Sequence, residues 1–277
     1  MKQLSTFPFA LSSSFLPAPS LDILQECRSC GVEALELSIG GNSPAMENAS
    51  IKGHWAKLID SAGKAGIKLW SAHLSFWEPY DIASLDEAVR SAAVARQCDM
   101  LRFLRAYTDI KVVVVHPSFE PILPHERWKQ AEASKNSLRI LAEEAASFGA
   151  QIAVECLPRT CLGNSIDSMA KLLSCDGRLR VCFDTNHMLT DTNEAFVRAF
   201  GEKIITIHVS DYDRIDERHR MPGEGVNNWN AIFKSLLAAG YAGPLLFELS
   251  HKYGYTLAQV GACYRRLCAD YTKKTNR

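Results

Sequence analysis

The sequence predicts a single-domain (β/α)8 barrel over residues 1–277. Eight apolar runs alternate with helical patterns, and no linker or low-complexity segment interrupts the alternation. The length also fits, because such barrels commonly occupy ~250 residues as one unit. An open doubly wound sheet is the structural alternative. It favours a glycine-rich loop after the first strand, and SSSFLPAPS (residues 12–20) contains no glycine.

Each expected strand is a nearly continuous apolar run, as a strand buried on both faces requires. Four of these runs follow a helical pattern closed by glycine, at Gly31, Gly66, Gly149 and Gly240. Glycine after the last helical turn supplies a left-handed cap. The eight runs are residues 7–15, 32–40, 67–74, 111–119, 150–157, 179–187, 203–211 and 244–250.

The segments between the strands carry helical patterns. Two helix starts fit the capping box, Ser84 with Glu87 and Asp191 with Glu194. The clearest patterns cover residues 21–30, 52–65, 125–148, 229–239 and 257–271.

Composition excludes several classes of protein. Lys plus Arg balance Asp plus Glu at 31 each, so no overall field favours nucleic acid or an anionic membrane. No apolar run approaches the ~20 residues that span a bilayer. Most of the nine cysteines lie inside apolar runs, where thiols behave as small hydrophobes in a reducing cell. We therefore expect a cytoplasmic protein with neither a membrane nor a nucleic-acid partner.

Ionisable side chains stand near the C-terminal ends of the expected strands, where barrel active sites are built. One such residue alone would be a hydrogen-bonded or solvated strand end. Several carboxylates together would repel unless a cation or shared protons balanced them, and imidazole with carboxylate suits Mn²⁺, Mg²⁺, Co²⁺ or Zn²⁺. The pattern predicts a divalent metal site from seven strand ends: Glu36, His73, His116, Glu155, Asp184, His208 and Glu248.

The last four strand ends are the strongest ligand candidates: Glu155, Asp184, His208 and Glu248. One imidazole and three carboxylates leave coordination positions open for water or substrate. His187, three residues after Asp184, either faces the same cavity or orients Asp184.

A loop crowded with charge, residues 210–229, follows His208. Such charge normally marks a solvated loop, but this one leaves a ligand strand and contains the turn-forming PGEG of residues 222–225, so we interpret it as a lid or substrate-facing loop. Arg218, His219 and Arg220 are candidates for contacts with hydroxyl or phosphate oxygens.

Two other groups of residues are candidates for substrate binding. Arg159 and Asn164 follow Glu155, where they either bind a substrate oxygen or tie the loop to its neighbours. Aromatic rings pack on sugar C–H faces or fill cores, so each aromatic candidate has two interpretations. These candidates are Trp70, Phe76, Trp77 and Trp229.

The segments ECLPRTCLGNS, CFDTNH, IHVSDYD, DERHRMPGEG and FELS resemble, in this order and spacing, the xylose isomerase-like TIM barrels. This superfamily includes sugar phosphate isomerases and epimerases, ketose epimerases and endonuclease IV. Resemblance to the ketose epimerases implies Glu155 and Glu248 as metal ligands that also exchange the substrate proton, Asp184 and His208 as ligands, and His187 as a substrate contact. Those epimerases carry an Arg where this chain has His219.

Resemblance to endonuclease IV implies a larger set of zinc ligands. The matching residues are His73, His116, His187 and His219, with Asp216 or Glu217 in place of an aspartate. A site with two or three metal ions therefore remains an alternative.

We expect an isomerase or epimerase of a small sugar, sugar phosphate or polyol-derived substrate. Its reaction would be carboxylate-mediated proton transfer through a metal-stabilised enediolate. The alternative is an endonuclease IV-like zinc phosphodiesterase acting on damaged DNA. Barrels of this kind often form dimers or tetramers, so a homo-oligomer is expected.

Overall fold

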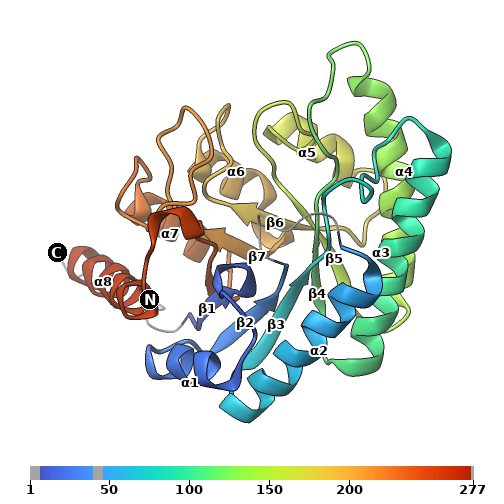
Figure 1. The fold of residues 1–277 in the computed structure, drawn as a ribbon. Coiled ribbons are helices and arrows are strands. Elements are labelled where there is room, and N and C mark those ends of the chain that lie inside the picture. The colour runs from blue at the N-terminus through green and yellow to red at the C-terminus, as the bar shows by residue number, and fades with distance from the viewer. Residues whose placement is uncertain (1–6, 40–45, 276–277) are drawn as a thin grey trace.

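The computed structural model describes residues 7–39 and 46–275, and it confirms the predicted barrel. Eight strands pair in parallel, each with its neighbours in sequence, and β8 closes on β1 (Figure 1). The strands are β1 (Phe9–Ser12), β2 (Ala34–Leu37), β3 (Lys68–His73), β4 (Val112–Val115), β5 (Gln151–Glu155), β6 (Arg180–Asp184), β7 (Ile204–Val209) and β8 (Leu245–Phe247).

Helices follow the strands and surround the barrel, as Figure 1 shows. Within the described ranges, none of them is both long and apolar enough to cross a membrane. They are α1 (Leu21–Ser29), α2 (Asn48–Ala65), α3 (Glu87–Tyr107), α4 (Arg127–Ala146), α5 (Ile166–Leu173), α6 (Asn193–Phe200), α7 (Trp229–Ala238) and α8 (Leu257–Thr275).

Both expected capping boxes are wrong. Asp86 caps α3, because its side chain accepts hydrogen bonds from the backbone N–H groups of Ala88 and Val89. Thr192 caps α6 in the same way. In both cases a nearer residue with a short oxygen-bearing side chain takes the cap.

The expected glycine caps are confirmed. Gly66 ends α2 with φ +68° and ψ +30°, a left-handed conformation that favours glycine. Gly31, Gly149 and Gly240 also have positive φ. Each lets the chain turn from a helix into the next strand, which begins two to five residues later.

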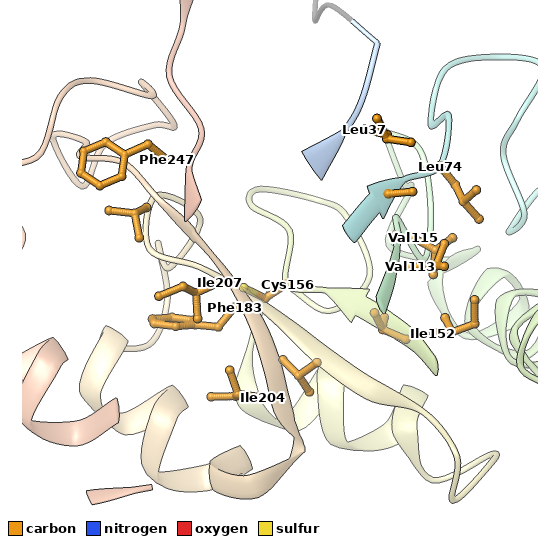
Figure 2. Packing of buried hydrophobic residues seen from close by; sticks show 14 of the residues in the cluster. Leu37, Leu74, Val113, Val115, Ile152, Cys156, Phe183, Ile204, Ile207 and Phe247 are labelled. Carbon is orange, nitrogen blue, oxygen red and sulfur yellow. The ribbon is translucent and has the colours of Figure 1, made fainter. Parts of the chain in front are cut away.

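Two faces of each strand serve different purposes. On the outer face, large apolar side chains pack against the helices, and Figure 2 shows Val113, Val115 and Ile152 of β4 and β5 among them. Inward-facing residues before the strand ends include the small side chains of Ala34, Ala153 and Cys182. Since side chains alternate along a strand, the residue two positions later points inward as well. This alternation directs Glu36, Glu155 and Asp184 into the C-terminal mouth of the barrel.

Candidate metal and substrate site

Seven ionisable residues meet at the C-terminal end of the barrel. Five are at least 98 % buried, and His116 and Glu248 retain only 16 % and 17 % side-chain exposure. Each belongs to a strand end or follows it directly: Glu36 (β2), His73 (β3), His116 (β4), Glu155 (β5), Asp184 (β6), His208 (β7) and Glu248 (β8). The register of the strands therefore assembles the site.

His208 is at the centre of the principal cluster. Its Nδ1 lies 3.0 Å from Glu155 Oε1, 3.1 Å from Glu248 Oε2 and 3.8 Å from Asp184 Oδ2. The four donor atoms of this set all lie within 4.8 Å of one another. These atoms come from the ends of four different strands and are close enough together to contact one ion.

These four residues fit a divalent metal ion. One imidazole nitrogen with carboxylate oxygens is a donor set that such ions accept. Asp184 Oδ2 is buried and makes no hydrogen bond to another described residue, which leaves its lone pairs available to a cation. Three buried carboxylates around a single imidazole also carry excess negative charge that a divalent ion would balance.

The opposite nitrogen of His208 faces the barrel interior. Its Nε2 lies 3.3 Å from the carboxylate of Glu36, which also accepts a 2.8 Å hydrogen bond from Ser71 Oγ. A carboxylate behind a metal-binding imidazole fixes the orientation of the ring and makes its other nitrogen a better ligand. Glu36 therefore directs His208 Nδ1 toward the cluster.

A second group of donors surrounds the other oxygen of Glu155. His73 Nε2 and His116 Nε2 each lie 3.0 Å from Glu155 Oε2, and the three residues form a further set with metal-ligand geometry. Burial alone would lower the pKa of His73, but its hydrogen bond to Glu155 raises the pKa to about 9. For His116, burial prevails and lowers the pKa.

A third group lies on the side of the β7–α7 loop. His187 Nδ1 is 3.5 Å from Asp184 Oδ2, and its Nε2 is 3.1 Å from Glu217 Oε2. Asp184, His187 and His219 form another set that could hold an ion. Burial opposes protonation of His187, but the charge of Asp184 and the hydrogen bond to Glu217 raise its pKa to about 10.

Burial and neighbouring charges shift the pKa values of the site's carboxylates in different directions. Burial would raise the pKa of Glu248, but the charge of His208 lowers it to about 2. For Asp184 burial prevails, and the pKa rises to about 6. His208 and His116 hold the pKa of Glu155 well below its usual range despite burial. The carboxylates and imidazoles of the cluster thus interact as one network.

A cavity of about 360 Å³ opens above these groups. Its lining includes His73, His116, Glu155, His187 and Glu248 at the base. Aromatic rings form one wall, since Phe76 stacks on His116 with 4.1 Å between centroids, and Trp77 stacks on Phe76 at 5.0 Å. The indole Nε1 of Trp77 is buried and makes no hydrogen bond within the described structure.

The structure separates the other predicted substrate contacts. Arg159, Glu217 and His219 line the cavity, whereas Asn164, Arg218 and Arg220 are absent from its lining.

The three residues outside the lining have partners in the loops. Asn164 accepts a hydrogen bond from Arg127 and donates one to the backbone of Arg159. Arg218 binds Asp213, and Arg220 Nε lies 3.4 Å from the hydroxyl of Tyr253. Asp216 is also outside the lining, but it lies 2.7 Å from Arg159, which lines the cavity.

Two aromatic candidates lie outside the cavity. Trp70 packs in the barrel interior with Ala10, Ala34 and Leu246, where its Nε1 donates to Thr206 Oγ1. Trp229 is buried, and its Nε1 donates to Asp211 Oδ2. Both support the scaffold rather than the pocket wall.

Glu120 is a cavity residue that the sequence pattern does not reveal. Glu120 follows β4 by five residues, lines the cavity and binds Arg159. No motif marks it, and only the meeting of two loops from different strands gives it a role.

Fold and donor set define a (β/α)8 barrel with a buried His/Glu/Asp cluster of metal-site type at its C-terminal mouth. The chain belongs to the xylose isomerase-like TIM barrel family, whose model matches residues 24–262. Among curated proteins, the uncharacterized protein y4fM of Sinorhizobium fredii is 30% identical over 102 residues. That match spans 35% of this chain and only 33% of the relative.

Several solved structures share the fold. A D-tagatose 3-epimerase-like protein is 22% identical with a TM-score of 0.79, and the match covers 97% of this chain and 98% of that one. An L-ribulose 3-epimerase is 19% identical with a TM-score of 0.75, covering 97% and 96% of the two chains. The D-psicose 3-epimerase of Clostridium cellulolyticum H10 is 18% identical with a TM-score of 0.73 and 97% coverage of each chain. At these identities the likeness shows the fold.

Proposed function

We propose that this protein is a metal-dependent isomerase or epimerase of a small sugar or polyol-derived substrate. The observation that carries the proposal is the arrangement around His208, where three carboxylates from different strands approach Nδ1 at the base of an aromatic-walled cavity. Glu155, Asp184, His208 and Glu248 would hold one Mn²⁺, Mg²⁺, Co²⁺ or Zn²⁺ ion. When bound, the ion would polarise a substrate carbonyl and acidify the neighbouring C–H group.

Glu155 and Glu248 would exchange the substrate proton. They come from β5 and from the residue after β8, and both approach His208, so a substrate in the cavity would contact carboxylates from two sides. One carboxylate removes the proton next to the carbonyl, and return from the other carboxylate on the opposite face gives the epimer. Return to the neighbouring carbon gives the isomer instead.

Neighbouring residues would prepare Glu155 for this role. His73 and His116 both contact Oε2, while Oε1 faces His208. Such contacts fix the carboxylate in one orientation, which reduces the cost of reaching the reactive geometry. Trp77 and Phe76 would pack against the C–H face of a sugar, and His187 would contact a hydroxyl.

Other observations support parts of this proposal. The solved structures similar to this chain include D-psicose, L-ribulose and D-tagatose-type 3-epimerases, whose names indicate free ketoses as substrates. Buried thiols such as Cys156 and Cys182, whose pKa values burial raises, fit a reducing cytoplasm.

A second candidate is a zinc phosphodiesterase acting on damaged DNA. One observation favours it: His73, His116 and Glu155 form a donor set, and Asp184, His187 and His219 form another, in addition to the principal cluster. Several ions in these sets would activate water and stabilise a leaving oxygen. The balance of 31 basic and 31 acidic residues gives no general attraction to a nucleic-acid backbone.

Proton exchange with solvent tests the proposed reaction. Metal-reconstituted protein is incubated with a panel of five- and six-carbon ketoses in deuterated water, and deuterium incorporation next to the carbonyl is followed by NMR. The proposal expects incorporation into at least one ketose, abolished by a chelator and by Glu155→Gln or Glu248→Gln. Hydrolysis of an abasic-site DNA duplex without exchange into any ketose would favour the phosphodiesterase.

A further inference from the structure

The mouth of the cavity has an unusual charge distribution. Among the described residues that line it, Arg159 is the only Lys or Arg, whereas four glutamates line it: Glu120, Glu155, Glu217 and Glu248. Two of these carboxylates, Glu155 and Glu248, belong to the proposed metal site. The other two lie at the rim beside Arg159.

Acidic groups already occupy the guanidinium of Arg159. Its Nε donates to both carboxylate oxygens of Glu120, at 2.9 and 3.1 Å. Its two terminal nitrogens donate to Asp216 Oδ1 at 2.7 Å and to Glu217 Oε1 at 2.9 Å, and one of them also contacts Glu120. The donors that would bind a substrate phosphate therefore already have partners.

Arg218, the next basic residue, is also paired with carboxylates. Arg218 Nε donates to Asp213 at 2.6 Å, and its Nη1 lies 3.6 Å from Asp216. Arg159 and Arg218 thus contact four carboxylates between them, and His187 and His219 are additional bases 3.1 and 4.0 Å from Glu217. The carboxylates outnumber the guanidinium groups by four to two.

We propose that the rim formed by Arg159, Glu120, Asp216 and Glu217 selects an uncharged sugar and rejects its phosphate ester. This inference rests on the proposed function, because it specifies the substrate class of the same site. A phosphate at the rim would meet more carboxylates than guanidinium groups, and like charges in contact discriminate strongly between ligands. The wall of Phe76 and Trp77 can pack against the apolar face of a sugar that carries no charge.

The rim also connects three loops. Glu120 follows β4, Arg159 follows β5, and Asp216 and Glu217 follow β7. Arg159 has φ +49°, a left-handed conformation that a non-glycine residue seldom adopts and that its partners must stabilise. This backbone conformation places the guanidinium between the three loops. The residues proposed to discriminate against phosphate therefore also hold the loops together.

The test is a double variant, Glu120→Gln with Asp216→Asn, which gives Arg159 two uncharged partners. Glu132→Gln with Asp167→Asn makes the same change in net charge on α4 and α5, where both carboxylates pair with lysines on the surface, and serves as the matched control. Calorimetric titration of the Mg²⁺-loaded proteins with inorganic phosphate, and with a ketose and its phosphate ester, gives the affinities. Circular dichroism checks the fold, and Glu120→Gln alone replaces the double variant if that variant does not fold.

Wild-type protein is expected to bind the free ketose more tightly than the ester. The rim variant is expected to bind phosphate about tenfold more tightly than wild type and to raise the ester-to-ketose affinity ratio about as much, unlike the control. Unchanged phosphate affinity, or wild-type preference for the ester, would overturn the proposal. If no ketose binds, the proposed function fails, while the phosphate titration still decides the role of the rim.

Discussion

Glu36 and His208 form a fully buried pair beneath the site, with 3.3 Å between the carboxylate of Glu36 and His208 Nε2. The pair reaches across the barrel from β2 to β7. Because Nε2 faces Glu36, Nδ1 faces Glu155, Asp184 and Glu248. A residue that touches neither the proposed metal nor the cavity thus determines how the central imidazole is presented.

Replacing Glu36 by Gln should weaken metal binding. The amide retains the shape but removes the charge behind the imidazole, and loss of such a partner typically costs 10- to 100-fold in metal affinity. Competition with a chromophoric chelator measures the affinity of the metal-free protein for Zn²⁺ or Co²⁺. Glu47→Gln, the same change on an exposed residue, is the control. An affinity within twofold of wild type would show that Glu36 does not act through His208.

The metal-free protein should lose stability as the pH rises above neutrality. The pKa of His73 is about 9 and that of His187 about 10 in the folded protein, compared with 6.5 for an unperturbed histidine. Groups with raised pKa values stabilise the fold fully below pH 6.5, and this contribution is lost as the pH rises through 9 and 10. Asp184, raised from 3.8 to about 6, acts in the same direction at lower pH.

Glu248 affects the stability of the fold at acidic pH. Its pKa is lowered from 4.5 to about 2, so its contribution to stability is present above pH 4.5 and is lost as the pH falls through 2.

Thermal melts test the effect of the histidines. Chelator-treated protein at pH 6, 7.5 and 9 should show a decreasing Tm, and the decrease should be smaller with metal bound. A Tm that increases over this range would contradict the proposed protonation of the histidines.

The loop after β7 requires glycine at position 225, where there is no space for a side chain. A Cβ there would collide with Asp211 Oδ1 and the backbone oxygen of Tyr212. Asp211 also accepts hydrogen bonds from Gly223 N, Asn227 N and Trp229 Nε1, so it cannot move freely.

Gly225→Ala should therefore lower the Tm by several degrees and displace the loop that carries Glu217 and His219. Gly53→Ala, on open surface within α2, is the matched control, and we expect it to be neutral or to stabilise the protein by about 0.5–1 kcal/mol. Thermal melts of both variants make the comparison. Equal Tm values would indicate that the loop relaxes without cost.

Trp77 should contribute to substrate binding through its ring. Trp77→Ala removes the wall beside Phe76 and should raise KM for the exchange reaction about tenfold. Trp77→Phe retains a ring and loses only the unpartnered N–H, so its KM should rise less. Steady-state kinetics separates the two effects. A change in kcat with constant KM would indicate a different role for Trp77.

Local patterns in the sequence determine most of the scaffold and the principal cluster. Side chains alternate along a strand, so an apolar run ending in a carboxylate or imidazole places that group at the barrel mouth, and Glu155, Asp184 and His208 all follow this rule.

The remaining features depend on contacts between distant segments. Glu120 and Asp216 take their roles only because two loops meet at Arg159, and no spacing in the chain encodes that meeting. Glu36 was visible as a strand end, but its pairing with His208 depends on the closure of the barrel.

Metal content per chain shows whether the four residues around His208 hold a single ion. The protein is purified without added metal, and elemental analysis compares wild type with the double variant Glu155→Gln and Glu248→Gln. The account predicts about one divalent ion per wild-type chain and loss of that ion in the double variant, because both changes remove carboxylate ligands. Two or three zinc ions per chain would contradict a single-ion sugar site and favour the phosphodiesterase, and no metal after reconstitution would contradict both.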